Sequence, residues 1–322
     1  MQESSSPTIK SIQEDFKKNL PNADWVVYES VNNENLYDGI ELAFSKRLQP
    51  LYRLEKAQII VSLGSDFLGV DDNNIYHTRK FAQNRNIVDE NSTMNRLYVA
   101  ESSISSTGSS ADHRLNIPQY EMENLLAELA YELKQLGLRI EAKKVKSSNN
   151  LWVKAAAKDL FDGRGESIII GGSSLSKEFH QLIALINYNL KAPVDYYPLN
   201  MSQISSIKNF ESLCNEMKNG KINNLIILGA NPVYDSPVDF DFAESLKKVK
   251  NSVHLTNIID ETSKLCSWNI AMNHYFECWG DAMTYDGHVS IVQPQIMPLF
   301  DSKSIIQVLS PIVHSKEQSA YD

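Results

Sequence analysis

The chain has 322 residues, of which 42% are hydrophobic and 22% charged, so it is a globular protein with one large domain or two ordinary ones. Its 31 basic and 40 acidic side chains give a net charge of −9, which argues against a nucleic-acid groove as the main functional surface. No apolar run approaches the roughly eighteen residues of a membrane span. The three cysteines form no C-x-x-C pair, so this sequence alone supplies neither a cysteine-ligated iron–sulfur cluster nor a Cys-rich zinc site.

Three segments repeat one pattern, an apolar run that ends in a glycine followed by small and polar residues. Such runs predict buried parallel strands that are covered on both faces. Glycine at the exit of a strand allows either a positive φ or a close approach of the backbone to a ligand or helix. In chain order the segments are Ile59–Leu63 into Gly64-Ser65-Asp66, Ile168–Ile170 into Gly171-Gly172-Ser173, and Leu225–Leu228 into Gly229-Ala230-Asn231.

Helical patterns separate these strands. The strongest is 121–136, where leucines recur three and four residues apart and form one apolar face. Strand–helix–strand alternation with short connections predicts an α/β fold with a doubly wound, mainly parallel sheet. The remaining predicted elements are strands at 25–28, 97–100 and 253–255, and helices at 37–48, 177–190 and 240–249.

The element pattern is weakest at 137–150, a basic stretch that ends in Ser-Ser-Asn-Asn. We therefore predict two lobes, 1–146 and 147–322. The Ser-rich segment 101–111 is either a solvated loop or a flexible loop over the strand ends that faces a ligand. After Ile258 the alternation of predicted strands and helices ends. The aromatic, Pro-containing segment that follows has no clear elements, which is typical of a binding or interface surface.

Neither end of the sequence has the features of a targeting segment. The first sixteen residues lack a basic region followed by an apolar one, so they are not a signal peptide. The last residues are polar and carry no stop signal. We expect the sequence to be a fragment of a longer parent protein.

The three glycine turns lie at the carboxyl ends of predicted strands, where open α/β sheets bind ligands. None matches G-x-G-x-x-G or the P-loop spacing. They either cap strands so that helices can pack, or they cradle a phosphate or nucleotide. Asp66 and the Asp71-Asp72 pair could likewise hold a ribose hydroxyl or a metal, or serve as turn and cap residues.

Histidines offer the other candidates for acid–base or metal chemistry, namely His113 beside Asp112, His274 and His288. They do not occur at metal-ligand spacing, which favours structural, hydrogen-bonded roles. The sequence also lacks the Gly-x-Ser-x-Gly motif, and Gly171-Gly172-Ser173-Ser174 has no second glycine of a nucleophile elbow, so Ser/His/Asp catalysis is dropped.

An aromatic cluster of Trp268, Tyr275, Phe276 and Trp279 lies in a stretch with no Lys or Arg between Lys264 and Lys303. Such a stretch could stack a ring or bury against a partner. It is a poor place for several phosphates unless backbone N–H groups bind them all.

Several motifs of the second half resemble the molybdopterin oxidoreductase family, more narrowly the iron–sulfur subunit of alternative complex III, a bacterial quinol-oxidising complex. The resemblance extends over about 55–299, with AQIIVSLGSD at 57–66 as its earlier strand and turn. The motifs that carry it are Leu228-Gly229-Ala230-Asn231-Pro232-Val233-Tyr234, Asp260-Glu261-Thr262, His274 to Asp281, and Gly287 to Pro294 with Pro298-Leu299.

The resemblance implies two Rossmann-like α/β lobes related by pseudo-symmetry, with two pterin guanine dinucleotides between them in active members. It places nucleotide contacts, as a vestigial cleft, at Gly64, Ser65, Asp66, Gly229, Ala230, Asn231 and Pro232. The sequence departs from active members because it has no cysteine-rich cluster motif, no matching Cys, Ser or Asp metal ligand and no C-terminal cap domain. These departures imply no catalytic residue and no metal ligand here, and a molybdopterin that has been lost.

The resemblance thus predicts a cofactor-less scaffold fragment of the iron–sulfur subunit of a quinol-oxidising respiratory complex. Its implied partners are the cluster-bearing domain of the same subunit, whose iron–sulfur clusters carry the electrons, and the cytochrome and membrane subunits. Its implied location is the periplasmic side of the bacterial inner membrane. Two alternatives stay open: an active molybdopterin oxidoreductase whose ligands lie outside this sequence, and a small-molecule binding module at the three glycine turns.

Overall fold

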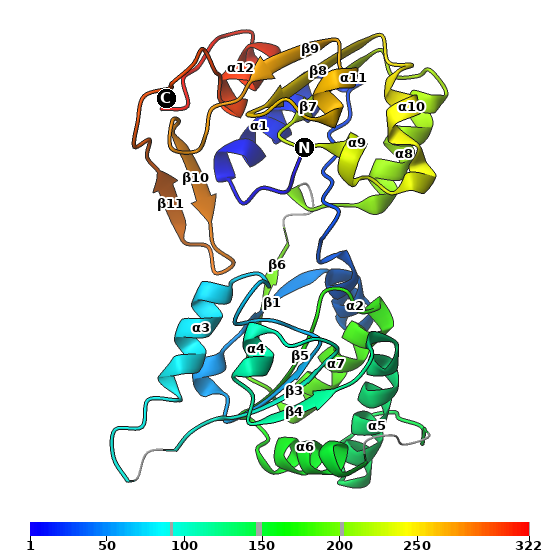
Figure 1. Ribbon diagram of the computed structural model, residues 1–322, viewed down its shortest axis with the longest axis vertical. Helices are drawn as coiled ribbons and strands as arrows, with labels where there is room; N and C mark the ends of the chain where they lie inside the picture. Colours follow the sequence, from blue (N-terminus) through cyan, green and yellow to red (C-terminus); the bar gives the residue numbers. More distant parts are fainter. Residues whose placement is uncertain (91–92, 146–149, 200–202, 322) are drawn as a thin grey trace. The chain divides into compact units, whose positions relative to one another are not determined.

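The computed structural model describes residues 1–90, 93–145, 150–199 and 203–321, and Figure 1 labels its elements. The chain forms two compact units. The inserted unit is Asn33–Leu199, and the outer unit combines Met1–Asn32 with Asn200–Asp322. Within the described ranges, no helix has the length and apolar character needed to cross a bilayer.

A four-stranded parallel sheet forms the centre of the inserted unit, with the strand order β4-β3-β2-β5. Its strands are β2 (Ile59–Leu63), β3 (Arg96–Glu101), β4 (His113–Asn116) and β5 (Ser167–Gly171). The helices of this unit are α2 (Glu34–Phe44), α3 (Asn74–Gln83), α4 (Ser106–Ser109), α5 (Met122–Gln135), α6 (Asn150–Asp162) and α7 (Lys177–Leu190).

Both faces of this sheet are buried, because successive side chains of each strand point to opposite sides. In β2, Val61 and Leu63 join the apolar cluster formed with α5, α6 and α7. Ile60, the residue before Val61, packs on the other side with Phe67 and Phe81, at the start of the β2–α3 connection and in α3. This alternation produces the three-layer, doubly wound architecture.

A separate antiparallel pair joins the two ends of the inserted unit. Here β1 (Leu48–Tyr52) pairs with β6 (Val194–Pro198), and Arg53 after β1 donates to the Asp195 carboxylate of β6 at 2.6 Å. Helices α2 and α7 also approach closely, since a Cβ added to Gly39 would lie 2.5 Å from the Cβ of His180.

The outer unit has a three-stranded parallel sheet in the order β7-β8-β9. Aromatic and apolar side chains of α8 and α10, with Tyr28, cover one face, and α1 and α12 cover the other. The elements are α1 (Pro7–Asn19), α8 (Ile207–Lys218), β7 (Asn224–Leu228), α9 (Pro232–Asp235), α10 (Phe242–Leu246), β8 (Asn251–Thr256), α11 (Glu261–Leu265), β9 (Trp268–Ala271) and α12 (Ile305–His314).

Residues 274–300, here named the aromatic arm, lie between β9 and α12. They contain a two-stranded antiparallel hairpin of β10 (Gly280–Met283) and β11 (Val289–Val292).

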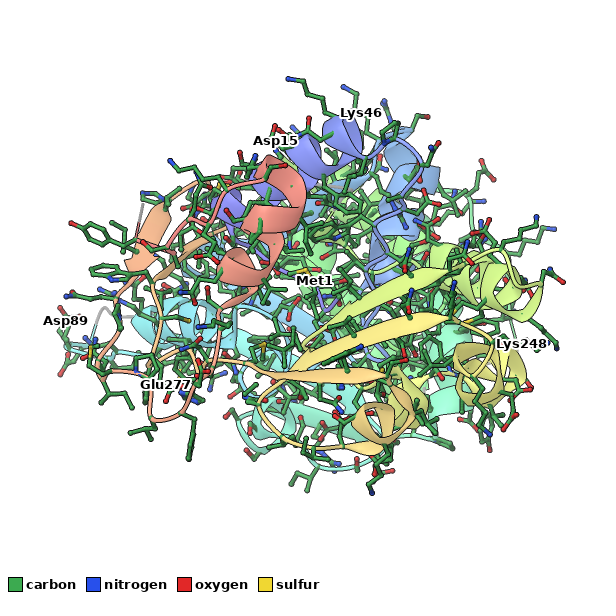
Figure 2. All side chains as sticks on the ribbon, turned by 90° about the horizontal axis from the view of Figure 1, so that it is seen from above. Met1, Asp15, Lys46, Asp89, Lys248 and Glu277 are labelled. Atoms are coloured by element: carbon green, nitrogen blue, oxygen red, sulfur yellow. The ribbon has the colours of Figure 1, made fainter. Side chains whose placement is uncertain are left out.

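Charged side chains in other parts of the chain, such as Lys46 and Lys248, are exposed and extend outward from the ribbon (Figure 2).

The predicted fold class, α/β with Rossmann-like, doubly wound lobes and mainly parallel sheets, is confirmed. The strands at the three glycine turns and the helix at 177–190 occur as predicted. The predicted strand at 25–28 is instead extended chain without a sheet partner among the described residues, and the predicted helix at 37–48 ends at Phe44, before β1. The segment after Ile258 contains α11, β9 and the hairpin, whose four- and five-residue elements lack long apolar runs.

The predicted boundary at 146/147 does not separate the two units. Residues 167–171 form β5, which pairs in parallel with β2, so both belong to the inserted unit. The stretch around the boundary connects α5 to α6, which pack on the same sheet; residues 146–149 themselves lie outside the described residues. Instead, the chain passes between the units near residues 32 and 200.

Candidate functional site

The turn after β2 contains three of the predicted contact residues, Gly64, Ser65 and Asp66. Gly64 has a φ of +66°, and its N–H donates to the carbonyl oxygen of Ala100 in β3 at 2.8 Å. The hydroxyl of Ser65 donates to the Asp71 carboxylate at 2.6 Å. This turn is therefore tied to the neighbouring strand and to its own continuation.

The Asp66 carboxylate is held by a threonine of the Ser-rich segment 101–111. Its Oδ1 accepts from both the N–H and the hydroxyl of Thr107, each at 2.8 Å. The Thr107 Oγ1 in turn accepts from the N–H of Leu68 at 3.1 Å. Thr107 is fully buried in α4, the single helical turn within the Ser-rich segment, and Ser105 caps that helix.

The turn after β7 repeats this arrangement in the outer unit. Gly229 also has a φ of +66°, and its N–H donates to the carbonyl oxygen of Leu255 in β8 at 2.9 Å. The Oδ1 of Asn231 accepts from the N–H of Thr262 at 3.2 Å and from its hydroxyl at 2.7 Å. The Thr262 Oγ1 accepts from the N–H of Val233 at 3.1 Å.

We name this arrangement the threonine clasp: a glycine turn, an Asp or Asn two residues later, and a buried threonine in the short helix after the next strand. The members of the two clasps correspond one to one, as do the helix caps Ser105 and Asp260. The two units are thus internal structural repeats at this point of the fold. A comparison of the two glycine turns along the sequence could have found the paired threonines.

The surroundings of the two clasps differ in charge. Beside the first clasp, burial raises the pKa of Asp71, although the hydrogen bond from Ser65 opposes this shift. Beside the second, the amide of Asn231 donates to Glu261 at 2.8 Å and lowers the pKa of that carboxylate. The first site is therefore an acidic, partly buried cluster, whereas the second joins a neutral amide to a surface carboxylate.

The third glycine turn serves a different purpose. A Cβ on Gly172 would lie 2.0 Å from the carbonyl oxygen of Gly64, so glycine is required there by the close approach of the two backbones. The N–H of Gly172 donates to the carbonyl oxygen of Leu63 at 3.0 Å. The structure thus brings together the turns after β2 and β5 in the inserted unit, while the turn after β7 belongs to the outer unit.

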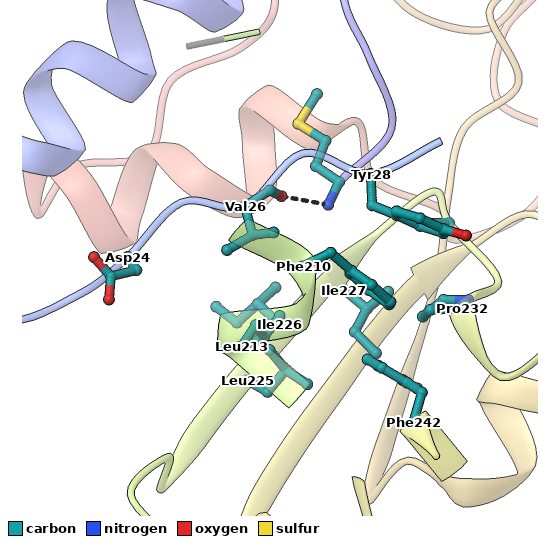
Figure 3. A pocket seen from close by; sticks show the side chains of 12 residues that line it. Asp24, Val26, Tyr28, Phe210, Leu213, Leu225, Ile226, Ile227, Pro232 and Phe242 are labelled. Atoms are coloured by element: carbon teal, nitrogen blue, oxygen red, sulfur yellow. Dashed lines mark hydrogen bonds between the residues drawn. The ribbon is translucent and has the colours of Figure 1, made fainter. Parts of the chain in front are cut away.

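A pocket of about 80 Å³ opens beside the second clasp, and Figure 3 shows its lining. Two predicted contact residues, Ala230 and Pro232, line it together with an aromatic stack. In that stack the rings of Tyr28 and Phe210 lie 4.0 Å apart, and Phe210 and Phe242 are also parallel. The walls are mainly apolar and suit an apolar group. Their ionisable groups include the Asp24 carboxylate and the Met1 amino group, which donates to the Val26 carbonyl oxygen and whose pKa burial lowers to about 6.

The remaining acidic candidates are engaged in local contacts. The Asp112 carboxylate accepts hydrogen bonds from Arg85 and from the N–H of Leu97. Burial alone would raise the pKa of this carboxyl, but the hydrogen bonds have the larger combined effect, so its pKa is lowered. Asp72 accepts from the Asn33 side chain at 2.6 Å.

Each of the predicted histidines makes contacts with residues of its own unit. His113 stacks on Tyr98, with ring centroids 4.6 Å apart, and His274 packs against Tyr275. His288 lies 3.0 Å from Asp286. Across the described part of the chain, no three or more His, Cys, Asp or Glu side chains are grouped as metal ligands would be.

A buried histidine that sequence reasoning missed supports the second turn. The ring nitrogens of His254 contact the Ser263 hydroxyl and the carbonyl oxygen of Ala230, both at 2.9 Å. Burial lowers the pKa of this imidazole, which keeps it neutral near pH 7. The contact with His254 therefore holds the backbone carbonyl of Ala230 in place.

The polar side chains that the resemblance placed against a nucleotide make contacts within their own units. The side chains of Ser65, Asp66 and Asn231 are already committed to hydrogen bonds within their own unit. Ala230 and Pro232 border apolar space instead. The Ser65, Asp66 and Asn231 side chains therefore each have a hydrogen-bond partner within the fold.

Two solved structures share the fold. Acetylene hydratase from Pelobacter acetylenicus superimposes with a TM-score of 0.72 at 11% identity, covering 97% of this chain and 54% of that one. The formyltransferase/hydrolase complex from Methylorubrum extorquens, solved with methylofuran, gives a TM-score of 0.62 at 10% identity and covers 98% of this chain and 90% of that one. This chain thus spans about half the length of the acetylene hydratase, and at such identities the likeness shows the fold alone. No protein-family profile and no curated protein matches the sequence.

Proposed function

We propose that this chain is a scaffold domain, without a redox centre of its own, of the molybdopterin oxidoreductase-like iron–sulfur subunit of a quinol-oxidising electron-transfer complex. The shared fold supports the broad class, a molybdopterin enzyme-like α/β protein. The motifs from Gly229 to Pro232 and from His274 to Leu299 support the narrower assignment by resemblance.

The threonine clasp is the observation that carries the scaffold role. In both units, the polar side chain that would meet a nucleotide instead bonds a buried threonine of its own fold. A buried hydroxyl that loses these partners would be destabilising, so ligand binding through Asp66 or Asn231 would first have to break the clasp. Side chains used in this way stabilise a lobe rather than hold a cofactor.

In the proposed complex, electrons travel through iron–sulfur clusters in a cluster-bearing domain of the parent subunit and through cytochrome partners. Membrane subunits would hold the assembly at the periplasmic face of the inner membrane. The aromatic arm supports a role in docking, because it exposes large apolar side chains in a stretch free of Lys and Arg.

Metal and pterin analysis of the full-length parent protein tests this proposal. The protein would be purified from its own host, with a known molybdopterin enzyme from the same cells as the positive control. We expect iron from the clusters, but neither molybdenum nor tungsten, and no fluorescent pterin after oxidative release. Stoichiometric molybdenum or tungsten with pterin would favour the active oxidoreductase.

A pair of variants separates the two functions further. Asn231→Ala should lower the stability of the outer unit, measured by chemical denaturation, and leave the pterin signal at the background of the wild type. Under the rival function, the same substitution would reduce a substantial pterin content. Asn219→Ala, at the exposed end of α8, is the matched control and should change neither quantity.

A further inference from the structure

The aromatic arm exposes large apolar side chains that belong to no core. Ile291, Met297, Leu299 and Phe300 are between 70% and 82% exposed. Tyr275 and Val289 are also more than half exposed. Single exposed apolar residues are ordinary, but a concentration in one short segment marks an interaction surface.

The arm is an ordered platform rather than a loose loop. The N–H groups of Gln295 and Ile296 donate to the carbonyl oxygen of Phe276 at 2.7 and 3.1 Å. The N–H of Leu299 donates to the Glu277 carboxylate at 3.0 Å. These bonds hold the two ends of the arm together, on either side of the hairpin, so its apolar side chains are presented from a fixed backbone.

The hairpin is also fastened to the core of the outer unit. Asp281 of β10 accepts from the N–H and the hydroxyl of Thr8 at 3.1 and 2.6 Å, and from the hydroxyl of Ser6, the N-cap of α1. The N–H of Met283 donates to the carbonyl oxygen of Ser5 at 2.9 Å. A two-stranded hairpin is marginal on its own, and these contacts give it support.

The charge of the arm and its margin selects among the surfaces that could cover it. Glu277, Asp281, Asp286 and Asp301 are acidic, and no Lys or Arg lies between Lys264 and Lys303. Lys303, at the margin of the arm, is itself paired with Asp301 at 3.3 Å. Anionic lipid headgroups and nucleic acid would be repelled and would find no basic anchor. A second copy of the arm would bring like charges together.

We infer that the aromatic arm docks on a separate protein subunit whose contact surface has an apolar centre and a rim of Lys and Arg side chains. This inference rests on the proposed function only in assuming that the chain works within a multi-subunit assembly. Complementary charge would set the orientation of the two partners, and burial of Ile291, Met297 and Phe300 would hold them together.

Site-specific photo-crosslinking in the full-length parent protein, expressed in its own host, tests this inference. p-Benzoylphenylalanine would replace Ile291 or Met297, and in control proteins the exposed Val238 or Tyr188. We expect the two arm positions to crosslink to one and the same subunit, at peptides rich in Lys or Arg, and the control positions not to reach that surface. Crosslinks to lipid, to a second copy, to the same polypeptide, or equally from Val238 would overturn the inference.

Charge reversal provides the second measurement. Asp301→Lys should reduce the crosslink from Met297 several-fold and weaken its dependence on salt, while Asp239→Lys, next to the control Val238, should not. The double variant Ile291→Ser with Met297→Ser should reduce recovery of that subunit roughly tenfold with an unchanged melting temperature. Unchanged crosslinking and recovery in these variants would contradict the inference.

The outcomes also separate the inference from the proposed function. A basic partner that belongs to no redox complex would support the docking surface and overturn the redox assignment. Recovery of a cluster- and cytochrome-containing complex that contacts Val238 instead of the arm would support the assignment and overturn the docking surface.

Discussion

The turns after β2 and β7 have the same backbone and the same threonine clasp, yet they lie in different chemical surroundings. The first borders the half-buried Asp71, and the second borders an apolar pocket lined by Phe210 and Phe242. The shared features, the glycine turn and the threonine clasp, are those with which the chain leaves a parallel strand and enters the next helix. The differing part is where the two units could have acquired separate roles.

A glycine turn at the end of a strand is therefore a weak indicator of a ligand-binding site. In both units, the polar residue after the glycine is satisfied by a threonine from another part of the chain. A binding function therefore has to be argued from groups left free by the fold, and the exposed arm provides these more clearly than either turn.

The largest expected effect concerns the turn after β5, which lacks a clasp. Gly172→Ala would place a Cβ 2.0 Å from the backbone oxygen of Gly64, and backbone atoms cannot move aside as a flexible side chain would. We expect the inserted unit to lose about 3 kcal/mol or more of its free energy of unfolding. Urea denaturation with hydrogen exchange read separately in each unit measures this; protection that remains at wild-type levels would contradict it.

Removing the clasp hydroxyl should affect the two units unequally. Thr107→Ala takes a donor from a carboxylate and an acceptor from the Leu68 N–H, which should cost the inserted unit about 2 to 3 kcal/mol. Thr262→Ala acts on a neutral amide, and should cost the outer unit about 1 to 2 kcal/mol. Thr→Ser at each position keeps the hydroxyl and serves as the control. Equal losses of unfolding free energy in the two units would show that the carboxylate of Asp66 does not strengthen its clasp relative to the amide of Asn231.

Buried histidines should make the inserted unit the more acid-sensitive one. Burial lowers the pKa of His77 to about 4, and neither ring nitrogen has a hydrogen-bond partner among the described residues, unlike those of His254. The unfolded state then binds the proton more tightly, so stability is fully present above the ordinary pKa near 6.5 and falls with pH toward 4. Between pH 8 and 5 this loss amounts to roughly 2 kcal/mol.

His77→Leu tests that assignment. The variant should reduce the pH dependence of the unfolding free energy of the inserted unit between pH 8 and 5 by about half, whatever it does to stability at pH 8. The rest remains because burial also lowers the pKa of His180 in the same unit to about 4. The outer unit, measured in the same samples, is the internal control. A slope that matches the wild type would show that His77 does not govern the acid response.

An effect as small as that of Thr262→Ala is expected at the two positive-φ glycines. Gly64→Ala and Gly229→Ala should each cost about 1 to 2 kcal/mol, because the backbone is left-handed while the nearest atoms leave room for a Cβ at 3.7 Å. Asn in place of Ala should recover part of the loss, since Asn tolerates this conformation. A clear difference between Gly64 and Gly229 in thermal unfolding would mean that the two turns are less alike than their dihedral angles indicate.

Local patterns in the sequence were sufficient for the central strands and for α7. The β-branched run before Gly64 predicts β2, and Ser176 with an apolar stripe defines α7 from Lys177 to Leu190. The strand predicted at 25–28 was wrong because burial of Val27 and Tyr28, rather than sheet pairing, explains their apolar character. An apolar run indicates that its residues are buried, and buried residues need not form a strand.

Long-range pairing was beyond the sequence patterns. Nothing local to β5 indicates that it pairs with β2 rather than with β7, so the boundary was placed inside the inserted unit. The clasp was missed for the same reason, because Asp66 and Thr107 lie far apart in the chain and meet only through the sheet. The proposed nucleotide contacts were chosen by resemblance, which does not reveal that their hydrogen bonds are already made.

The antiparallel pair of β1 and β6 has a consequence for how the chain folds. It joins the beginning and the end of the inserted unit, so the whole of Asn33–Leu199 is a continuous segment closed upon itself. The outer unit, by contrast, needs α1 to meet α12 across that entire insertion. A loop this long is costly to close as a flexible coil, but far less so once it has become compact. The inserted unit is therefore expected to form first during synthesis and to bring the two halves of the outer unit together.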